Sequence, residues 1–182
     1  MKVEFARKPV LRGERVVLRP FAPGDAAVIA RIVEDPEVRR FTGGGDVRFD
    51  ADELERIYAD RITADDRLDL AVLDRVTGEL VGEVVLNEWD ERNRSCNFRT
   101  LIGPGGRDRG LGTEATRLLV EHGFKTLNLH RIHLYVYAFN PRARRVYEKA
   151  GFTAEGVDRD ALWHDGVWVD AVRMSILEHE CR

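Results

Sequence analysis

The segment from Arg107 to Thr113 carries residue types that suit the binding of phosphate groups. Gly110 and Gly112 have no Cβ, so the backbone can approach a ligand closely there. A helix is expected to begin in this segment, and the first amides of a helix have no acceptor within it. These amides, the positive end of the helix dipole and the side chains of Arg107 and Arg109 predict a site that would fit a pyrophosphate. The alternative is that the glycines only permit a tight turn from strand to helix.

Two other phosphate-binding patterns fit this segment less well. The spacing from Gly105 to Gly110 is that of a P-loop, but Leu111 and Gly112 stand where that motif needs Lys and then Ser or Thr. Gly110-x-Gly112-x-x-Ala115 satisfies the loose dinucleotide pattern, yet the next strand ends without a carboxylate for a ribose. Neither phosphoryl transfer nor dinucleotide binding is favoured.

A second candidate feature is the pair Asn140 and Tyr147. They are seven residues apart, which is nearly two helical turns, so one elongated ligand could meet both on one helix face. Each residue also has a structural interpretation. Asn140 suits a helix N-cap before Pro141, and Tyr147 could pack in the core.

Periodicity and turn residues place these features on an α/β (α+β) fold. Alternating apolar residues predict strands over residues 15–21, 68–73, 80–89, 95–102, 132–138, 152–161 and 167–176. Helical spacing predicts helices over residues 25–33, 54–62, 110–129 and 141–150, and residues 43–50 read as a flexible connection. Strand, helix, strand, helix, strand after an antiparallel meander predicts a mixed, mostly antiparallel sheet with helices on its faces.

Composition excludes several classes of protein. The 182 residues carry a formal net charge of -3, which gives no case for a dedicated binder of nucleic acid or of anionic membranes. The longest apolar run, from Ala26 to Ala30, is far below the roughly 20 residues of a membrane helix. Cys96 and Cys181 are too few for a disulfide framework or a zinc site. We expect one domain over residues 1–182, a cytoplasmic location and no metal.

The two features together resemble the GCN5-related N-acetyltransferase (GNAT) family, and within it the ribosomal-protein alanine acetyltransferase (RimJ/RimL-like) branch. The first match is to the acetyl-CoA motif, Arg107-x-x-Gly110-x-Gly112. The second is to a signature further along the chain, Asn140-x-x-Ala143-x-x-x-Tyr147-x-Lys149-x-Gly151-Phe152. The opening residues 15–21 and the closing residues 165–170 also look like that branch, so the resemblance spans residues 15–176.

The resemblance implies a GNAT fold with about seven strands and a role for each matched position. Backbone amides from Arg109 to Thr113, including those of Gly110, Leu111 and Gly112, would hold the pyrophosphate of coenzyme A. The strand residues Leu101, Ile102 and Gly103 would pair with the pantetheine arm, and Asn140 would bond that arm or a neighbouring backbone group. Tyr147 would lie by the sulfur and donate a proton to the departing thiolate. A kink or bulge near residues 98–101 would open the cleft.

The chemistry expected from the resemblance is acetyl transfer from acetyl-CoA to a primary amine, by direct attack in a ternary complex. The sequence does not identify the base. Glu83 and Glu88 lie on a central strand, and Asn97 stands where relatives often carry Glu, so we favour deprotonation through water. No nucleophile site is visible, which argues against a covalent intermediate.

The acceptor expected from the branch is a small-molecule amine or the N-terminal α-amino group of a peptide or protein. The alternative from another class is a non-catalytic acyl-CoA-binding sensor or assembly module with the same fold. The closing strands could also pack between subunits, so a homodimer is plausible.

Overall fold

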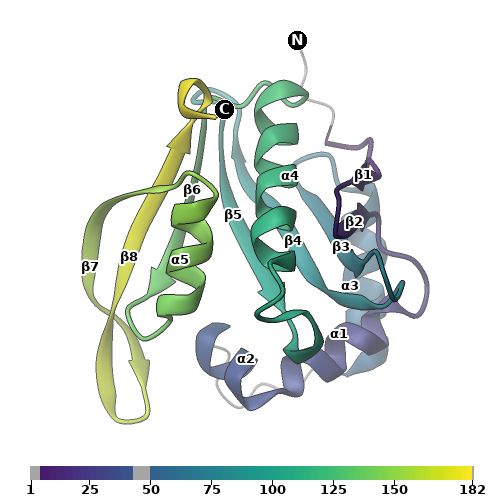
Figure 1. Ribbon diagram of the computed structural model, residues 1–182, viewed down its shortest axis with the longest axis horizontal. Helices are drawn as coiled ribbons and strands as arrows, with labels where there is room; N and C mark the ends of the chain where they lie inside the picture. The colour runs from purple at the N-terminus through teal and green to yellow at the C-terminus, as the bar shows by residue number, and fades with distance from the viewer. Residues whose placement is uncertain (1–4, 43–49, 182) are drawn as a thin grey trace.

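A computed structural model describes residues 5–42 and 50–181 and contains a single eight-stranded sheet (Figure 1). The spatial order of the strands is β1-β2-β3-β4-β5-β6-β8-β7. Their bounds are β1 Leu11–Arg12, β2 Val16–Arg19, β3 Leu68–Asp74, β4 Leu80–Asp90, β5 Ser95–Ile102, β6 Arg131–Tyr137, β7 Thr153–His164 and β8 Val167–Leu177. The expected mixed, mostly antiparallel sheet is confirmed, with eight strands rather than about seven. The additional strand, β1, has two residues and is too short to show a period.

Helices cover both faces of the sheet. Their bounds are α1 Asp25–Glu34, α2 Pro36–Thr42, α3 Ala51–Thr63, α4 Leu111–Lys125 and α5 Pro141–Lys149. In Figure 1, α4 and α5 lie in front of the sheet and α3 lies behind it. Two buried clusters agree with this layering, one joining α4 and α5 to the sheet and the other joining α1, α2 and α3 to it.

The sheet divides between β5 and β6. These strands form the one parallel pairing among the described strands, and it contains only three residue pairs, from Ser95↔Arg131 to Asn97↔His133. From Phe98 onward, β5 stays paired with β4 but has no partner in β6. The second half of β5 therefore presents a free backbone edge toward the space beside β6.

The bulge expected near residues 98–101 is wrong in its position. Pairing of β5 with β4 is regular from Asn97 through Ile102, and the register shifts between Asn87 and Asp90 of β4. Glu88 has a positive φ of 55° in that shift, as one residue of a bulge often has. The cleft nevertheless opens beside residues 98–101, because β6 diverges from β5 there.

Helix boundaries followed local signals where these were strong. Asn140 is the N-cap of α5, as expected, and Gly151 after α5 has a φ of 102°. Gly110, where the other helix was expected to begin, is the N-cap of α4. The expected extension of α4 to residue 129 is wrong. The helix ends at Lys125, and Asn128 has a left-handed φ of 53°, which no helical continuation allows.

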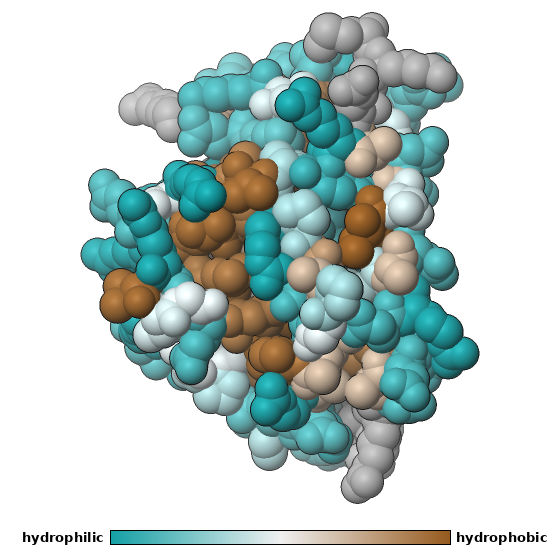
Figure 2. Space-filling model, turned by 90° about the vertical axis from the view of Figure 1, so that its right-hand side faces the viewer, coloured by the Kyte–Doolittle hydropathy of each residue, from teal (hydrophilic) through white to brown (hydrophobic). Residues whose placement is uncertain are grey.

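The last two strands form a long hairpin at the edge of the sheet. Asp165 and Gly166 form its two-residue turn, and both have positive φ, as a type I′ turn requires. Figure 2 shows the side of the molecule that lies at the right in Figure 1, where hydrophobic residues gather between hydrophilic ones. No helix in the described ranges is long and apolar enough to cross a membrane. Residues 43–49 of the expected flexible connection lie outside the described residues.

Candidate active site

The N-terminus of α4 presents backbone amides without a side-chain cap. Gly110 has a φ of 77° and makes no side-chain cap hydrogen bond. The first hydrogen bond of the helix runs from the Glu114 amide to the Gly110 carbonyl oxygen (3.1 Å). The amides of Leu111, Gly112 and Thr113 precede it and have no acceptor within the helix. These amides and the helix dipole suit an anionic ligand, as expected from the sequence.

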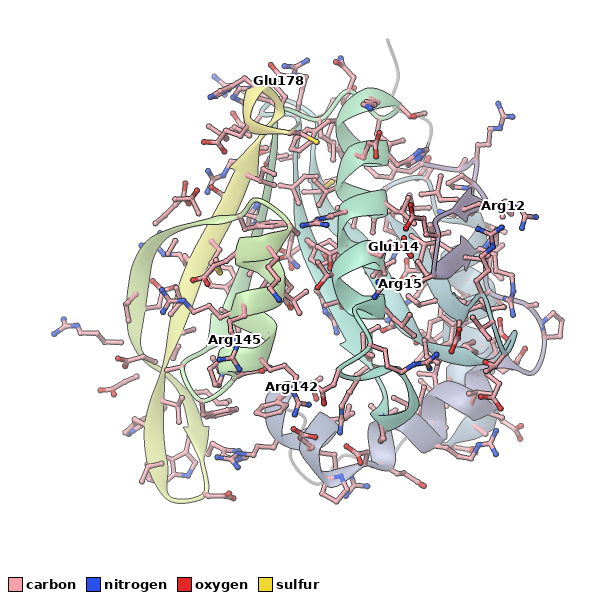
Figure 3. The ribbon with its side chains drawn as sticks, in the orientation of Figure 1. Arg12, Arg15, Glu114, Arg142, Arg145 and Glu178 are labelled. Atoms are coloured by element: carbon pink, nitrogen blue, oxygen red, sulfur yellow. The ribbon has the colours of Figure 1, made fainter. Side chains whose placement is uncertain are left out.

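Glu114 fastens the opening residues of the chain to α4. Its carboxylate accepts hydrogen bonds from the backbone amides of Glu14 (2.9 Å), Arg15 (2.8 Å) and Val16 (2.8 Å). The guanidinium of Arg15 donates to the Arg109 carbonyl oxygen (3.0 Å), so Arg15 lies against the loop that leads into the helix (Figure 3). Residues far apart in sequence thereby hold the helix start in place.

The two arginines of this loop, which were expected to add charge for a phosphate, both form ion pairs with carboxylates of other segments. Arg107 is paired with Asp35 (2.9 Å) and Glu37, which lie just before and within α2. Arg109 is paired with the buried Asp74 (2.6 Å). Both guanidinium groups therefore hold the loop against neighbouring segments. The backbone amides at the helix start are the groups left for an anion.

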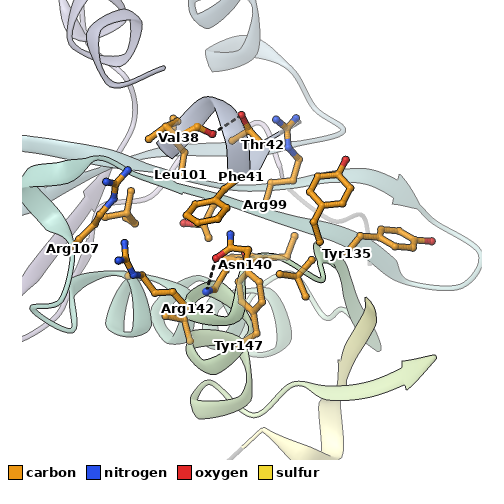
Figure 4. A pocket seen from close by; sticks show the side chains of 18 of the residues that line it. Val38, Phe41, Thr42, Arg99, Leu101, Arg107, Tyr135, Asn140, Arg142 and Tyr147 are labelled. Carbon is orange, nitrogen blue, oxygen red and sulfur yellow. Dashed lines mark hydrogen bonds between the residues drawn. The ribbon is translucent and has the colours of Figure 1, made fainter. Parts of the chain in front are cut away.

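A cavity of about 340 Å³ lies where β5 and β6 diverge. Of the expected site residues, Leu101, Ile102, Arg107, Gly112, Asn140 and Tyr147 line it, whereas Gly103, Arg109, Gly110, Leu111 and Thr113 do not. Gly103 donates its amide to Val81 (2.8 Å), and Leu111 is buried in the core. The structure thus brings the helix start, the free edge of β5 and the first turns of α5 to one cavity (Figure 4).

Tyr147 lies in the wall of this cavity and is only 7% exposed. Its ring packs edge-on against Phe98 (centroids 6.1 Å apart) and is tilted against Phe152 (6.0 Å). Within the described residues its hydroxyl has no hydrogen-bond partner, so the phenol is anchored by its ring. Burial raises the pKa of Tyr147, which keeps the hydroxyl protonated at neutral pH.

Asn140 both caps a helix and lines the cavity, so the structural and the ligand-binding interpretations of this residue are compatible. Its side-chain oxygen accepts from the Ala143 amide (3.0 Å) and caps α5. The same side chain lines the cavity, and in Figure 4 it lies next to Tyr147. The cap fixes the orientation of the amide group, whose nitrogen is left for another acceptor.

The structure places no carboxylate of the described residues in the cavity lining. Glu83 is buried on the opposite face from Tyr147, accepts a hydrogen bond from the Tyr58 hydroxyl (2.6 Å), and has its pKa raised by desolvation. Glu88 is exposed at the irregular part of β4. Asn97 does line the cavity, and its amide donates to Asn87 (2.9 Å).

Sequence reasoning missed the part of the cavity that α2 and β6 supply. Val38, Phe41 and Thr42 of α2 line it together with Tyr135 and Tyr137 of β6. The alternation of β6 placed both tyrosines on one face, which was a usable signal.

A signal for α2 was also present. Asp35 is followed by Pro36, and the Asp35 carboxylate accepts from the Val38 amide (3.0 Å). An acceptor side chain before a proline is typical of a helix start. Aromatic stacking of Phe41 on Phe139 (6.0 Å) then joins α2 to the residues that follow β6.

Comparisons with known proteins agree with this geometry. The chain is 35% identical over 103 residues to spermidine N(1)-acetyltransferase of Escherichia coli (strain K12), a match that covers 57% of this chain and only 55% of that protein's length. It is 29% identical over 175 residues to "Putative ribosomal N-acetyltransferase YdaF" of Bacillus subtilis (strain 168), covering 92% of this chain and 93% of that one.

A solved structure shares the fold over nearly the whole chain. The spermidine N-acetyltransferase of Vibrio cholerae in complex with CoA and spermine matches with a TM-score of 0.83 and 28% identity, covering 93% of this chain and 99% of that one. The acetyltransferase (GNAT) domain family matches residues 15–153, which is well over half of the sequence. The chain therefore belongs to the acetyltransferase (GNAT) domain family.

Proposed function

We propose that the protein is an N-acetyltransferase that moves an acetyl group from acetyl-CoA to a primary amine. One observation carries this proposal: one cavity extends between β5 and β6 from the start of α4 to the side chain of Tyr147. A coenzyme must have its phosphates and its reactive end bound at the same time, and this cavity offers a group for each.

The coenzyme would be held mainly by backbone groups. Amides from Arg109 to Thr113 would bind the pyrophosphate, because the helix start has no side-chain cap there. Leu101 and Ile102 of β5, and Gly103 after it, would pair with the pantetheine arm, since β6 leaves this edge of β5 free. Asn140 would donate its side-chain amide to the same arm while its oxygen caps α5.

Tyr147 is proposed as the catalytic residue. Acetyl-CoA supplies the acetyl group as an activated thioester, and the leaving group is a thiolate that needs a proton. The Tyr147 hydroxyl is protonated at neutral pH because burial raises its pKa, so it can donate that proton. The amine would attack directly in a ternary complex. It would lose its proton through water, since no carboxylate of the described residues lines the cavity.

The relatives support an amine acceptor and differ in which one. Similarity to spermidine acetyltransferases favours a small molecule, whereas the name of YdaF favours a ribosomal acceptor. The RimJ/RimL-like pattern favours the N-terminal α-amino group of a protein or peptide. We propose a primary amine of either origin. We also propose that residues 1–182 form one N-acetyltransferase domain that works in the cytoplasm.

A homodimer through the closing hairpin is part of the proposal. Trp163 and Trp168 face each other across β7 and β8 (ring centroids 5.1 Å apart) and are 57% and 59% exposed. Large exposed aromatic side chains on adjacent strands are typical of an interface.

The second candidate is a coenzyme-binding sensor, which is favoured by the lack of a carboxylate among the described residues that line the cavity. Thiol release from acetyl-CoA, assayed with a panel of amines and peptides, separates the two functions. An enzyme releases CoA thiol in proportion to acetylated amine. Tight CoA binding without thiol release from any acceptor would favour the sensor.

A further inference from the structure

The cavity lining contains three arginines and, among the described residues, no carboxylate. The arginines are Arg99, Arg107 and Arg142. Arg107 and Arg142 are both paired with Glu37 of α2. Arg99 is exposed and takes part in none of the ion pairs or side-chain hydrogen bonds formed within residues 5–42 and 50–181. Its positive charge is available to a bound molecule.

Arg99 lies in the half of the cavity away from the start of α4. In Figure 4, Arg107 is at one end, and Arg99 is next to Thr42 of α2 in the other part of the cavity. The preceding residue of β5, Phe98, packs against Tyr147 on the face that carries α5. Side chains alternate along a strand, so Arg99 is directed to the opposite face, which α1, α2 and α3 cover. Arg99 therefore lines the part of the cavity that lies on the α2 face of β5, away from the start of α4.

The carboxylate of Glu83 interacts electrostatically with Arg99 but does not form an ion pair with it. Burial raises the pKa of Glu83, and the charge of Arg99 is one of the smaller influences that lower it. The Glu83 carboxylate is engaged by the Tyr58 hydroxyl (2.6 Å) and forms no ion pair with Arg99. The described residues thus leave the guanidinium of Arg99 without a bonded counter-ion.

The positive charge of Arg99 would disfavour polyamines and favour amines that carry a carboxylate. A polyamine keeps one or more ammonium groups after its reacting nitrogen has lost a proton. Each would meet Arg99, and no acidic residue of the described lining would offset that charge. A carboxylate would instead match the planar fork of the guanidinium, which can bind both oxygens at once.

We propose that Arg99 is a specificity residue that binds a carboxylate of the acceptor, so that the protein prefers amines carrying a carboxylate over polyamines. The inference rests on the proposed function, because the acceptor is the amine that would be acetylated. It concerns only how that acceptor binds. The carboxylate could belong to a free aminocarboxylate or to an acidic residue next to a peptide N-terminus, and both place a primary amine within reach of one carboxylate.

The test measures binding of matched acceptors to the CoA-saturated protein by calorimetry, with turnover measured in parallel. The small-molecule arm compares β-alanine with β-alaninamide, and the peptide arm compares Ala-Asp-Ala-amide with Ala-Asn-Ala-amide; spermidine is the polyamine probe. The wild type should bind at least one carboxylate form about tenfold or more tightly than its amide, and more tightly than spermidine. The arm that shows this preference identifies the source of the carboxylate.

Arg99→Gln should abolish the preference, and Arg99→Lys should retain part of it, because Lys keeps the charge without the fork. The matched control is Arg145→Gln. Arg145 is also exposed and in Figure 3 lies on α5, but it does not line the cavity, so its loss should leave the preference unchanged. CoA affinity and thermal stability should stay the same in all three variants, since Arg99 makes no bonds within the described residues.

The outcomes separate this inference from the proposed function. A preference that disappears in Arg99→Gln, without turnover of any acceptor, would refute the enzyme and keep the binding role of Arg99. Equal affinity for carboxylate and amide forms in the wild type, tighter binding of spermidine, or a preference that survives in Arg99→Gln would overturn the inference.

Discussion

The two halves of the cavity present different kinds of groups. At the start of α4 the groups are backbone amides that have no acceptor within the helix, and of these residues Gly112 lines the cavity itself. In the other half they are side chains from α2, β5 and β6, such as Phe41, Arg99 and Tyr135. Backbone recognition suits a ligand that stays the same, whereas side chains can change with the acceptor while the fold is kept.

The largest effect is expected where the two halves meet, at Tyr147. Tyr147→Phe keeps the ring packing on Phe98 and Phe152 but removes the proton donor. We expect kcat to fall by about 100-fold or more with little change in CoA affinity. Steady-state kinetics with a productive acceptor measure this effect. An unchanged kcat would show that the phenol is not the acid.

The pH dependence of the wild type sharpens the same point. A phenol with an ordinary pKa would lose its proton near pH 10, whereas burial raises the pKa of Tyr147, so the acid form persists to higher pH. The plot of kcat against pH should therefore show no decline from this group up to about pH 10. A decline at a pH well below 10 that disappears in Tyr147→Phe would contradict the raised pKa.

A smaller but specific effect is expected from the backbone half. Gly110→Val forces a branched side chain onto a φ of 77° and places its Cβ 2.9 Å from the Arg15 guanidinium. CoA affinity should fall about tenfold or more, as measured by calorimetry. Gly105→Val is the control, because a Cβ at Gly105 meets no atom within 4 Å and its φ is not positive. Equal losses in both variants would remove the helix start from the coenzyme site.

The smallest effect is expected at the ion pairs that Glu37 forms with two arginines of the cavity lining. Glu37 of α2 pairs with Arg107 and Arg142, so it holds positive charge away from the coenzyme. Glu37→Gln should strengthen CoA binding about two- to fivefold, the range typical of a partly exposed ion pair, and less so at high salt. Weaker CoA binding in this variant would mean that the ion pairs position the loop rather than compete with the phosphates.

The backbone half could be predicted from sequence because its signals are local. Gly110, Gly112 and the cap at Asn140 each act within one turn of a helix, and the structure places all three as expected. The spacing between Asn140 and Tyr147 indicated that one ligand could meet both, and the role of Tyr147 at the sulfur came from the family resemblance. Such features depend on residues that are close in the sequence, so they can be predicted without knowledge of the fold.

The other half could not be predicted because it depends on contacts between distant segments. The side chain of Arg107 carried a charge suited to phosphate, but its partners Asp35 and Glu37 lie just before and within α2, far earlier in the chain. The irregularity of β4 at Glu88 and the early separation of β6 from β5 likewise arise from strand pairing, which spacing does not encode.

The central claim is that amides at the start of α4 bind a diphosphate and thereby bring a thioester to Tyr147. A crystal structure of the protein with CoA bound tests it most directly. We expect diphosphate oxygens about 2.7–3.2 Å from the amide nitrogens of residues 110–113, and the CoA sulfur facing the Tyr147 hydroxyl. A diphosphate bound elsewhere, or a sulfur on the far side of β5 from Tyr147, would contradict the account.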